Sequence, residues 1–158
     1  MIRPAGAADL PFLEAMLFEA AHWRASAPRP VQEQALAKPE LARYVEGWGR
    51  PGDAGVVAVG GGLQVGAAWY RLFTAARPGY GFVGERTPEL TVGVVAGERG
   101  RGVGTALLRA LLESTRDAGF ERISLSVEPG NPAARLYARA GFTRVGGGSG
   151  AWTMLAEL

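Results

Sequence analysis

The chain has 158 residues, 47% of them hydrophobic and 20% charged, with a formal net charge of only +2. This size and composition are typical of one globular domain spanning residues 1–158. The lack of cysteine excludes disulfides, thiolate metal sites and a cysteinyl acyl-enzyme, and the single histidine, His22, excludes a multi-histidine metal site. Scattered basic residues argue against nucleic acid as a partner. With no signal-peptide pattern at the start and no apolar run near 20 residues, we expect a cytoplasmic protein without a membrane partner.

The first half of the chain predicts one strand, two helices and a hairpin. Apolar spacing predicts a short strand at 1–3 and a helix over 8–23. A second helix is expected over 31–46, kinked or split into two pieces by Pro39. Glycines at 60–62 join two apolar runs, which predicts a hairpin with strands at 55–59 and 64–73. A flexible connection, 74–88, follows.

The second half alternates strands and helices around a glycine-rich turn. The expected order is a strand over 89–96, a helix from 106 to about 118, a strand over 123–127, a helix over 132–140, and strands over 142–145 and 151–156. The whole order predicts an α/β layer fold around a central sheet.

The stretch Arg-Gly-Arg-Gly-Val-Gly-Thr at 99–105 is the most informative part of the sequence. The first turn of a helix carries unpaired N–H groups and a positive dipole end, so it attracts anions. Gly102 and Gly104 lack a Cβ, which lets a phosphate approach the backbone. A ligand carrying a diphosphate is therefore expected here.

Three other glycine motifs can be excluded at this loop. A Walker loop needs Gly-Lys-Ser/Thr, but Lys38 is the only lysine. A dinucleotide-binding G-x-G-x-x-G needs glycine where Thr105 or Leu107 stands. A kinase-type loop would be followed by catalytic-loop and metal-binding motifs, which the chain lacks. The remaining pattern is Arg-x-x-Gly-x-Gly after a strand.

A second motif lies about 30 residues downstream, where 131–142 reads Asn-Pro-Ala-Ala-Arg-Leu-Tyr-Ala-Arg-Ala-Gly-Phe. With the Arg-x-x-Gly-x-Gly loop, in this order, it resembles the GNAT superfamily of acyl-CoA-dependent N-acetyltransferases. The close resemblance covers roughly 89–145. It implies a mixed, mostly antiparallel sheet flanked by helices, with two parallel strands, 90–96 and 123–127, that splay apart.

The resemblance also implies acetyl-CoA as co-substrate and no metal. Loop amides would hold the pyrophosphate, and backbone groups of strand 90–96 would pair with the pantetheine arm. The expected contacts are Val94, Val95, Ala96, Arg99, Gly100, Arg101, Gly102, Val103, Gly104, Thr105, Asn131 and Arg139. Several have plainer alternatives: the valines could be core residues, the arginines solvated charges, and Asn131 a helix cap.

Two residues are candidates for proton transfer. By resemblance, the Tyr137 phenol would protonate the leaving thiolate, although it could instead pack beside Phe142. Glu89, at the start of the strand before the loop, would take the proton of the acceptor amine directly or through water. Glu85 is the reserve candidate, and either glutamate could be an exposed carboxylate. The N–H of Val94 or Val95 would polarise the thioester carbonyl.

The acceptor is expected to be a primary amine, either a small molecule, an amino acid or a protein N-terminus. In this fold the acceptor groove would be lined by aromatic residues, with Trp23, Tyr70 and Tyr80 as candidates. Trp69 and Tyr70 could instead pack the sheet. A non-catalytic acyl-CoA-binding sensor or an interaction module is the alternative function, and the resemblance is compatible with a homodimer.

Overall fold

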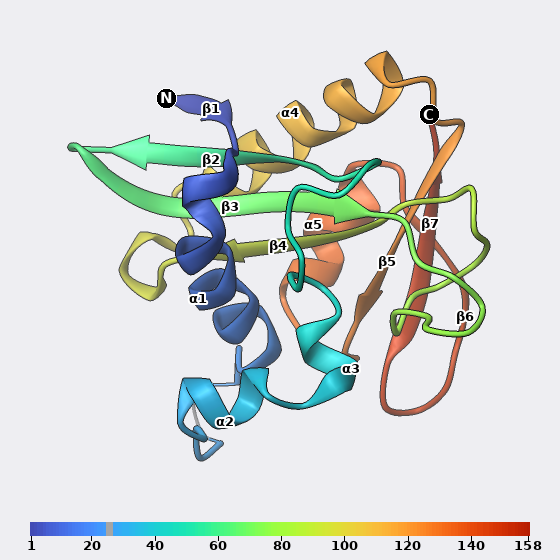
Figure 1. Ribbon diagram of the computed structural model, residues 1–158, viewed down its shortest axis with the longest axis horizontal. Coiled ribbons are helices and arrows are strands. Elements are labelled where there is room, and N and C mark those ends of the chain that lie inside the picture. The colour runs from blue at the N-terminus through green and yellow to red at the C-terminus, as the bar shows by residue number, and fades with distance from the viewer. Residues whose placement is uncertain (25–26) are drawn as a thin grey trace.

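The computed structural model describes residues 1–24 and 27–158, which form a seven-stranded sheet in the order β1-β2-β3-β4-β5-β7-β6 (Figure 1). The strands are β1 (Ile2–Pro4), β2 (Ala54–Gly60), β3 (Leu63–Arg71), β4 (Glu89–Val94), β5 (Arg122–Val127), β6 (Thr143–Gly147) and β7 (Trp152–Glu157). The predicted glycine hairpin joins β2 and β3, with an irregular register after Ala58. The predicted α/β fold with a mixed, mostly antiparallel sheet is confirmed.

The neighbours β4 and β5 run parallel and are in register at one position, Glu89 opposite Ser124. Ser124 N–H donates to the Pro88 carbonyl over 2.9 Å at this point. Beyond it the strands diverge: in Figure 1, β4 lies nearly across the view whereas β5 runs steeply downward. The predicted splay of two parallel strands is therefore present, and it opens toward the C-terminal end of β4.

Helices cover both faces of the sheet. They are α1 (Leu10–Ala21), α2 (Gln32–Leu36), α3 (Pro39–Ala42), α4 (Val103–Asp117) and α5 (Ala133–Arg139), with 3-10 turns η1 (Ala7–Asp9) and η2 (Ala96–Glu98). The expected second helix is two short pieces divided before Pro39, as predicted, because a proline suits the first turn of a helix but not its interior. None of the helices within 1–24 and 27–158 has the length and apolar character needed to cross a membrane.

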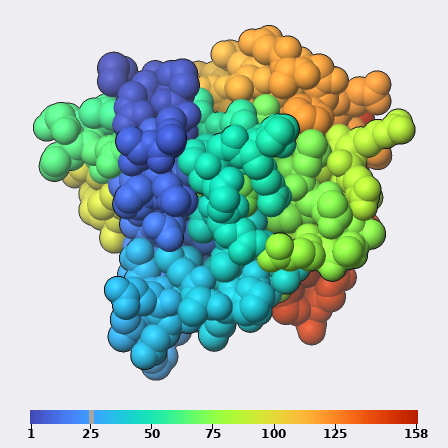
Figure 2. Space-filling view, viewed as in Figure 1, coloured from blue at the N-terminus to red at the C-terminus, as the bar shows by residue number. Residues whose placement is uncertain are grey.

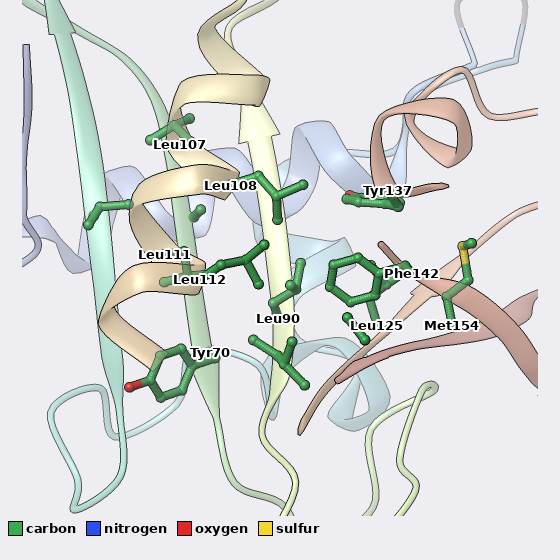
Figure 3. Packing of buried hydrophobic residues seen from close by; sticks show 14 of the residues in the cluster. Tyr70, Leu90, Leu107, Leu108, Leu111, Leu112, Leu125, Tyr137, Phe142 and Met154 are labelled. Atoms are coloured by element: carbon green, nitrogen blue, oxygen red, sulfur yellow. The ribbon is translucent and has the colours of Figure 1, made fainter. Parts of the chain in front are cut away.

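Two hydrophobic cores lie on opposite faces of the sheet because side chains alternate along each strand. The core under α4 and α5 holds Leu107, Leu108 and Leu111 against Leu90 and other strand residues (Figure 3). The core under α1 contains Leu13, Met16 and Leu17, and it continues onto the segment after α3. Leu90 faces α4, so its neighbour Glu89 faces the α1 side, where the site is built.

Candidate active site

A cavity of about 980 Å³ lies where β4 and β5 diverge. It reaches from the end of α1 and from the α3 segment, which is α3 with the turn after it (39–46), past β4 and β5, to the start of α4 and to α5. Its lining contains most of the predicted site: Glu89, Val94, Arg99, Gly100, Gly102, Val103, Gly104, Thr105, Asn131, Tyr137, Arg139, Trp23 and Tyr80. One space thus joins residues of both sequence motifs to Glu89.

Glu89 is 2% exposed and sits at the head of β4, and among the described residues it forms no ion pair. The Tyr44 hydroxyl and, over 3.1 Å, the Gly81 N–H both donate to its Oε2. Burial raises the pKa of Glu89 from 4.5 to about 7, against the lowering effect of these two hydrogen bonds. A carboxyl with a pKa near neutrality can accept and release a proton at physiological pH, which suits a general base.

Tyr44 follows α3 and is held in place by both its ring and its backbone. The ring lies edge-on to Phe73, with centroids 5.2 Å apart, and parallel to Tyr80 at 6.4 Å. Trp69 Nε1 donates to the Tyr44 carbonyl over 2.9 Å, and Tyr80 N–H donates to the Tyr44 hydroxyl over 2.7 Å. Burial, and then the charge of Glu89, raise the pKa of the phenol well above 10. It therefore remains a proton donor in the hydrogen bond to Glu89.

The backbone around Tyr44 is anchored by a buried ion pair. Arg71, fully buried at the end of β3, binds Asp53 with Nη2 to Oδ2 at 2.6 Å and Nε to Oδ1 at 3.1 Å. Its Nη1 donates to the carbonyls of Arg43 and Glu46 over 3.0 and 2.7 Å. These bonds fix both sides of Tyr44, so the hydroxyl is presented to Glu89 by a rigid support.

The connection predicted to be flexible, 74–88, packs closely over the same carboxylate. A Cβ at Gly79 would collide with Glu89 Oε1, and one at Gly81 would lie 2.5 Å from the Leu125 carbonyl carbon. Figure 2 shows this segment, in yellow-green, beside the α3 segment on the face it displays. The reserve base Glu85 lies on the exposed part of the connection, where it accepts the Ala75 N–H at 2.9 Å. It does not line the cavity, so the geometry favours Glu89.

The glycine loop leads into α4 as the sequence predicts. Gly100 and Gly102 adopt φ of +77° and +83°, and no described atom lies within 4 Å of a Cβ built at either position. The first intrahelical bond runs from Ala106 N–H to the Gly102 carbonyl at 3.1 Å. The N–H groups of 103–105 therefore precede the helical ladder and are available to an anion.

The backbone at the end of β4 corrects one prediction. Val95 N–H donates to the Val65 carbonyl of β3 at 2.9 Å, so it is not available to a thioester carbonyl. Because backbone groups alternate in direction along a strand, those of Val94 point toward the split instead. The Val94 carbonyl accepts Arg99 Nε at 3.3 Å, and Arg99 also pairs with Glu19 at 3.2 Å.

Residues Val95, Ala96 and Arg101 do not line the cavity, although the resemblance implied contacts there. Ala96 begins the turn η2, and Arg101 is an exposed charge 3.5 Å from Glu98. Arg101 is thus solvated in this structure, and its contact with a phosphate stays a prediction.

Asn131, just before α5, and Tyr137, on α5, each have a structural contact and also line the cavity. Asn131 Oδ1 accepts the N–H of Ala133, the first residue of α5, at 3.0 Å, while Pro132 occupies the N-cap position of the helix. Tyr137 is 7% exposed and lies edge-on to Phe142, with ring centroids 5.9 Å apart (Figure 3). Burial raises its pKa to about 12. Both residues also line the cavity, as does the exposed Arg139.

Of the predicted acceptor residues, Trp23 and Tyr80 line the cavity but Tyr70 does not. Tyr70 is 2% exposed and packs edge-on to Phe120 in the α4 core, on the opposite face from Glu89. Figure 3 shows Tyr70 beside α4. The alternative that Tyr70 packs the sheet is correct, because alternation along β3 turns Tyr70 toward α4.

The sequence reasoning missed Tyr44, Leu41 and Glu40, which also line the cavity. Periodicity assigned them to a helix whose inward face could not be matched to Glu89. In the parts of the chain that the structure describes, no group of three or more His, Asp or Glu side chains is arranged to hold a metal ion.

Comparison with known families decides the relationship. Residues 16–142 match the model of the acetyltransferase (GNAT) family. The chain belongs to this family. The resemblance drawn from the two motifs is confirmed.

Two curated relatives of this GNAT chain are mycothiol acetyltransferases. The one from Thermobispora bispora is 37% identical over 122 residues, covering 77% of this chain and 40% of the relative. The one from Corynebacterium glutamicum is 40% identical over 70 residues, covering 41% of this chain and 24% of the relative. The chain thus matches 40% or less of the length of these relatives.

Solved structures give the same fold over the whole chain. The ribosomal-protein-alanine N-acetyltransferase of Brucella melitensis superposes with a TM-score of 0.69 at 28% identity, covering 100% of this chain and 99% of that one. The putative acetyltransferase yncA of Salmonella typhimurium, solved with its cofactor acetyl-CoA, gives 0.68 at 25% identity, covering 100% and 93%.

Proposed function

We propose that this GNAT chain transfers an acetyl group from acetyl-CoA to a primary amine, by direct attack of the amine within a ternary complex. The observation that carries the proposal is the single cavity at the β4–β5 split. It is bordered by a carboxyl of near-neutral pKa, a set of free helix N-terminal amides and a buried phenol. Its volume of about 980 Å³ is at the upper end of the range for ligand pockets, which suits a large cofactor arm and an acceptor together.

The residues at the α4 end fit a diphosphate. Open space beside Gly100 and Gly102 leaves room for phosphate oxygens near the amides of 103–105. Arg99 and Arg139 add positive charge at this end of the cavity. The backbone of Val94 would pair with the pantetheine arm in the manner of an added strand, after Arg99 Nε leaves its carbonyl.

Glu89 and Tyr137 would handle the two protons of the reaction. The acceptor arrives as an ammonium ion, and Glu89 takes a proton so that the nitrogen lone pair can attack the acetyl carbon. As the carbon–sulfur bond breaks, the Tyr137 hydroxyl donates a proton to the leaving sulfur and regains one from the attacking nitrogen, which thereby loses its second proton and becomes the amide nitrogen. The phenol pKa of about 12 keeps the hydroxyl proton in place until the thiolate develops.

The acceptor end of the cavity supports an amine with an apolar portion, from a small molecule or a peptide. Trp23, Leu41 and Tyr80 supply apolar and aromatic surface there. The carboxylates of Glu40 and Glu128 also line the cavity, and their negative charge would attract an incoming ammonium ion.

Thermal-shift titration with acetyl-CoA, CoA and NAD tests the cofactor first. At 100 times its dissociation constant a ligand adds about 2.7 kcal/mol, or roughly 5–11 °C in a domain of this size. We expect a rise with acetyl-CoA and CoA but not with NAD, followed by amine-dependent thiol release that Glu89→Gln removes. A rise without thiol release from any amine would favour a sensor, and no rise at millimolar acetyl-CoA would refute the proposal.

A further inference from the structure

While Glu89 is ionised, the hydrogen bonds around Tyr44 have only one possible direction. Tyr80 N–H can only donate, and it donates to the Tyr44 oxygen over 2.7 Å. The phenol hydrogen is therefore directed to its other partner, Oε2 of Glu89. Gly81 N–H donates to the same carboxylate oxygen over 3.1 Å. Because Oε2 already accepts two hydrogen bonds, it binds a proton less readily than Oε1 does.

The other carboxylate oxygen of Glu89, Oε1, is buried but accepts no hydrogen bond from the described residues. Among the described residues, the two buried side-chain atoms found without a hydrogen-bond partner are Glu89 Oε1 and Ser124 Oγ. These residues are register neighbours across the β4–β5 pair. A proton bound by Glu89 will therefore reside on Oε1, the oxygen that no hydrogen bond occupies.

The charged neighbour of Glu89 on β3 does not pair with the Glu89 carboxylate. Arg71 is its register partner on β3, but the guanidinium is engaged by Asp53 and by two carbonyls of the α3 segment. No ion pair to Glu89 is found within 1–24 and 27–158. Arg43, from the α3 segment, donates to the Pro78 carbonyl. Tyr44 is therefore the ionisable side chain that contacts the carboxylate directly.

We propose that Tyr44 is a positioning residue, which by donating to Oε2 orients the Glu89 carboxylate so that Oε1 is the oxygen that binds and releases the proton of the reaction. This inference rests on the proposed function. Tyr44 itself exchanges no proton, since its hydroxyl hydrogen stays between Tyr44 and Oε2. Its effect is to stabilise the ionised carboxylate and to fix the direction in which the free oxygen points.

The Tyr44→Phe variant removes the donor and keeps the ring that packs on Phe73 and Tyr80. A hydrogen bond to a charged group contributes about 1.5–3 kcal/mol, so its loss should raise the pKa of Glu89 by roughly one to two units. ¹³C NMR of protein labelled at the glutamate carboxyl carbons measures this directly, with the Glu89 signal assigned by its absence in Glu89→Gln. A titration midpoint that is unchanged or lower in Tyr44→Phe would overturn the proposal.

This titration is independent of activity. If acetyl-CoA does not bind and no amine reacts, the proposed function fails while the NMR result still reports on Tyr44 and Glu89. The wild-type protein offers a second measurement in case Tyr44→Phe does not fold. The shielded Tyr44 hydroxyl proton should give a downfield ¹H signal with a cross-peak to Gly81 N–H, which moves as Glu89 titrates. A signal that stays fixed through that titration would also overturn the proposal.

Kinetics then separates positioning from a general structural role. The acid limb of the pH profile of kcat/KM should move upward by the same one to two units in Tyr44→Phe. The double variant with Glu89→Gln should be no slower than Glu89→Gln alone, because Tyr44 acts through Glu89. Tyr70→Phe is the matched control: it makes the same chemical change in the core under α4, on the opposite face of the sheet from Glu89, and should leave the acid limb of the pH profile unchanged. An unmoved limb in Tyr44→Phe, or additive losses in the double variant, would contradict the assignment.

Discussion

The burial of Glu89 predicts an unusual dependence of stability on pH. Its pKa is about 7 in the folded chain, raised mainly by burial, against 4.5 for the ordinary side chain. Between pH 4.5 and pH 7 the folded protein therefore keeps the Glu89 proton, whereas the unfolded chain releases it. This contribution to the free energy of unfolding is complete below pH 4.5, declines as pH rises through the window, and is lost above pH 7.

The magnitude follows from the same two values. Each unit between them corresponds to about 1.4 kcal/mol, so ionising the buried carboxyl costs the fold about 3 kcal/mol in total. A neutral amide at the same position does not titrate. The stability of wild type minus that of Glu89→Gln should therefore fall by about 3 kcal/mol between pH 4 and pH 8.

Urea unfolding of both proteins at five pH values provides the assay. Taking the difference cancels every group that titrates alike in the two proteins. Glu85→Gln serves as the control for losing one carboxylate, since Glu85 is exposed on the neighbouring connection. The additivity error for independent sites is on the order of 0.5 kcal/mol. If the difference in unfolding free energy between wild type and Glu89→Gln stays constant within that error across the pH range, the surroundings of the carboxyl do not favour its neutral form and the prediction is refuted.

Three further perturbations test other parts of the structure. Gly79→Ala places a Cβ against Glu89 Oε1 and should lower kcat/KM by up to about 100-fold, with the affinity for acetyl-CoA retained. Gly84→Ala is its control: no described atom lies within 4 Å of a Cβ there, so this variant should match wild type in the same assay. The hydrogen bonds from Arg3 are the main cause that lowers the pKa of Asp9 to about 2. The ionised carboxylate therefore stabilises the fold above pH 4, and this stabilisation is lost as pH falls through 2. Urea unfolding should show Asp9→Asn to be about 2 kcal/mol less stable than wild type at pH 7 but not at pH 2. Tyr137→Phe should reduce kcat by 100-fold or more while calorimetry finds the acetyl-CoA dissociation constant within about twofold of wild type.

Local patterns predicted the parts of the site that lie close together in the sequence. The loop at 99–105 contains its own left-handed glycines and its own helix start. Tyr137 lies on one short helix, and Asn131 lies just before it and accepts the N–H of its first residue. Because each of these units is set by neighbours within a few residues, their motifs could be recognised without knowledge of the tertiary structure.

The orientation of strand residues was harder to predict. Trp69 and Tyr70 are adjacent aromatics on β3, and the sequence alone does not say which of them faces α1. The register of β3 with β4 decides it, and puts Tyr70 in the α4 core. The same register directs Val95 N–H to Val65. Long-range strand pairing, not the composition of either strand, fixes both outcomes.

Tyr44 illustrates what no local pattern could supply. It is separated from Glu89 by 45 residues and from Tyr80 by 36, and it meets both through the turn after α3. A sequence signal exists only in hindsight: Gly79 and Gly81 flank Tyr80, and neither position has room for a Cβ. Glycines that look like marks of flexibility are required here by close packing. The 74–88 connection is thereby bound to the carboxylate that the reaction would use, so a change in its backbone acts on Glu89 as directly as a change in Tyr44.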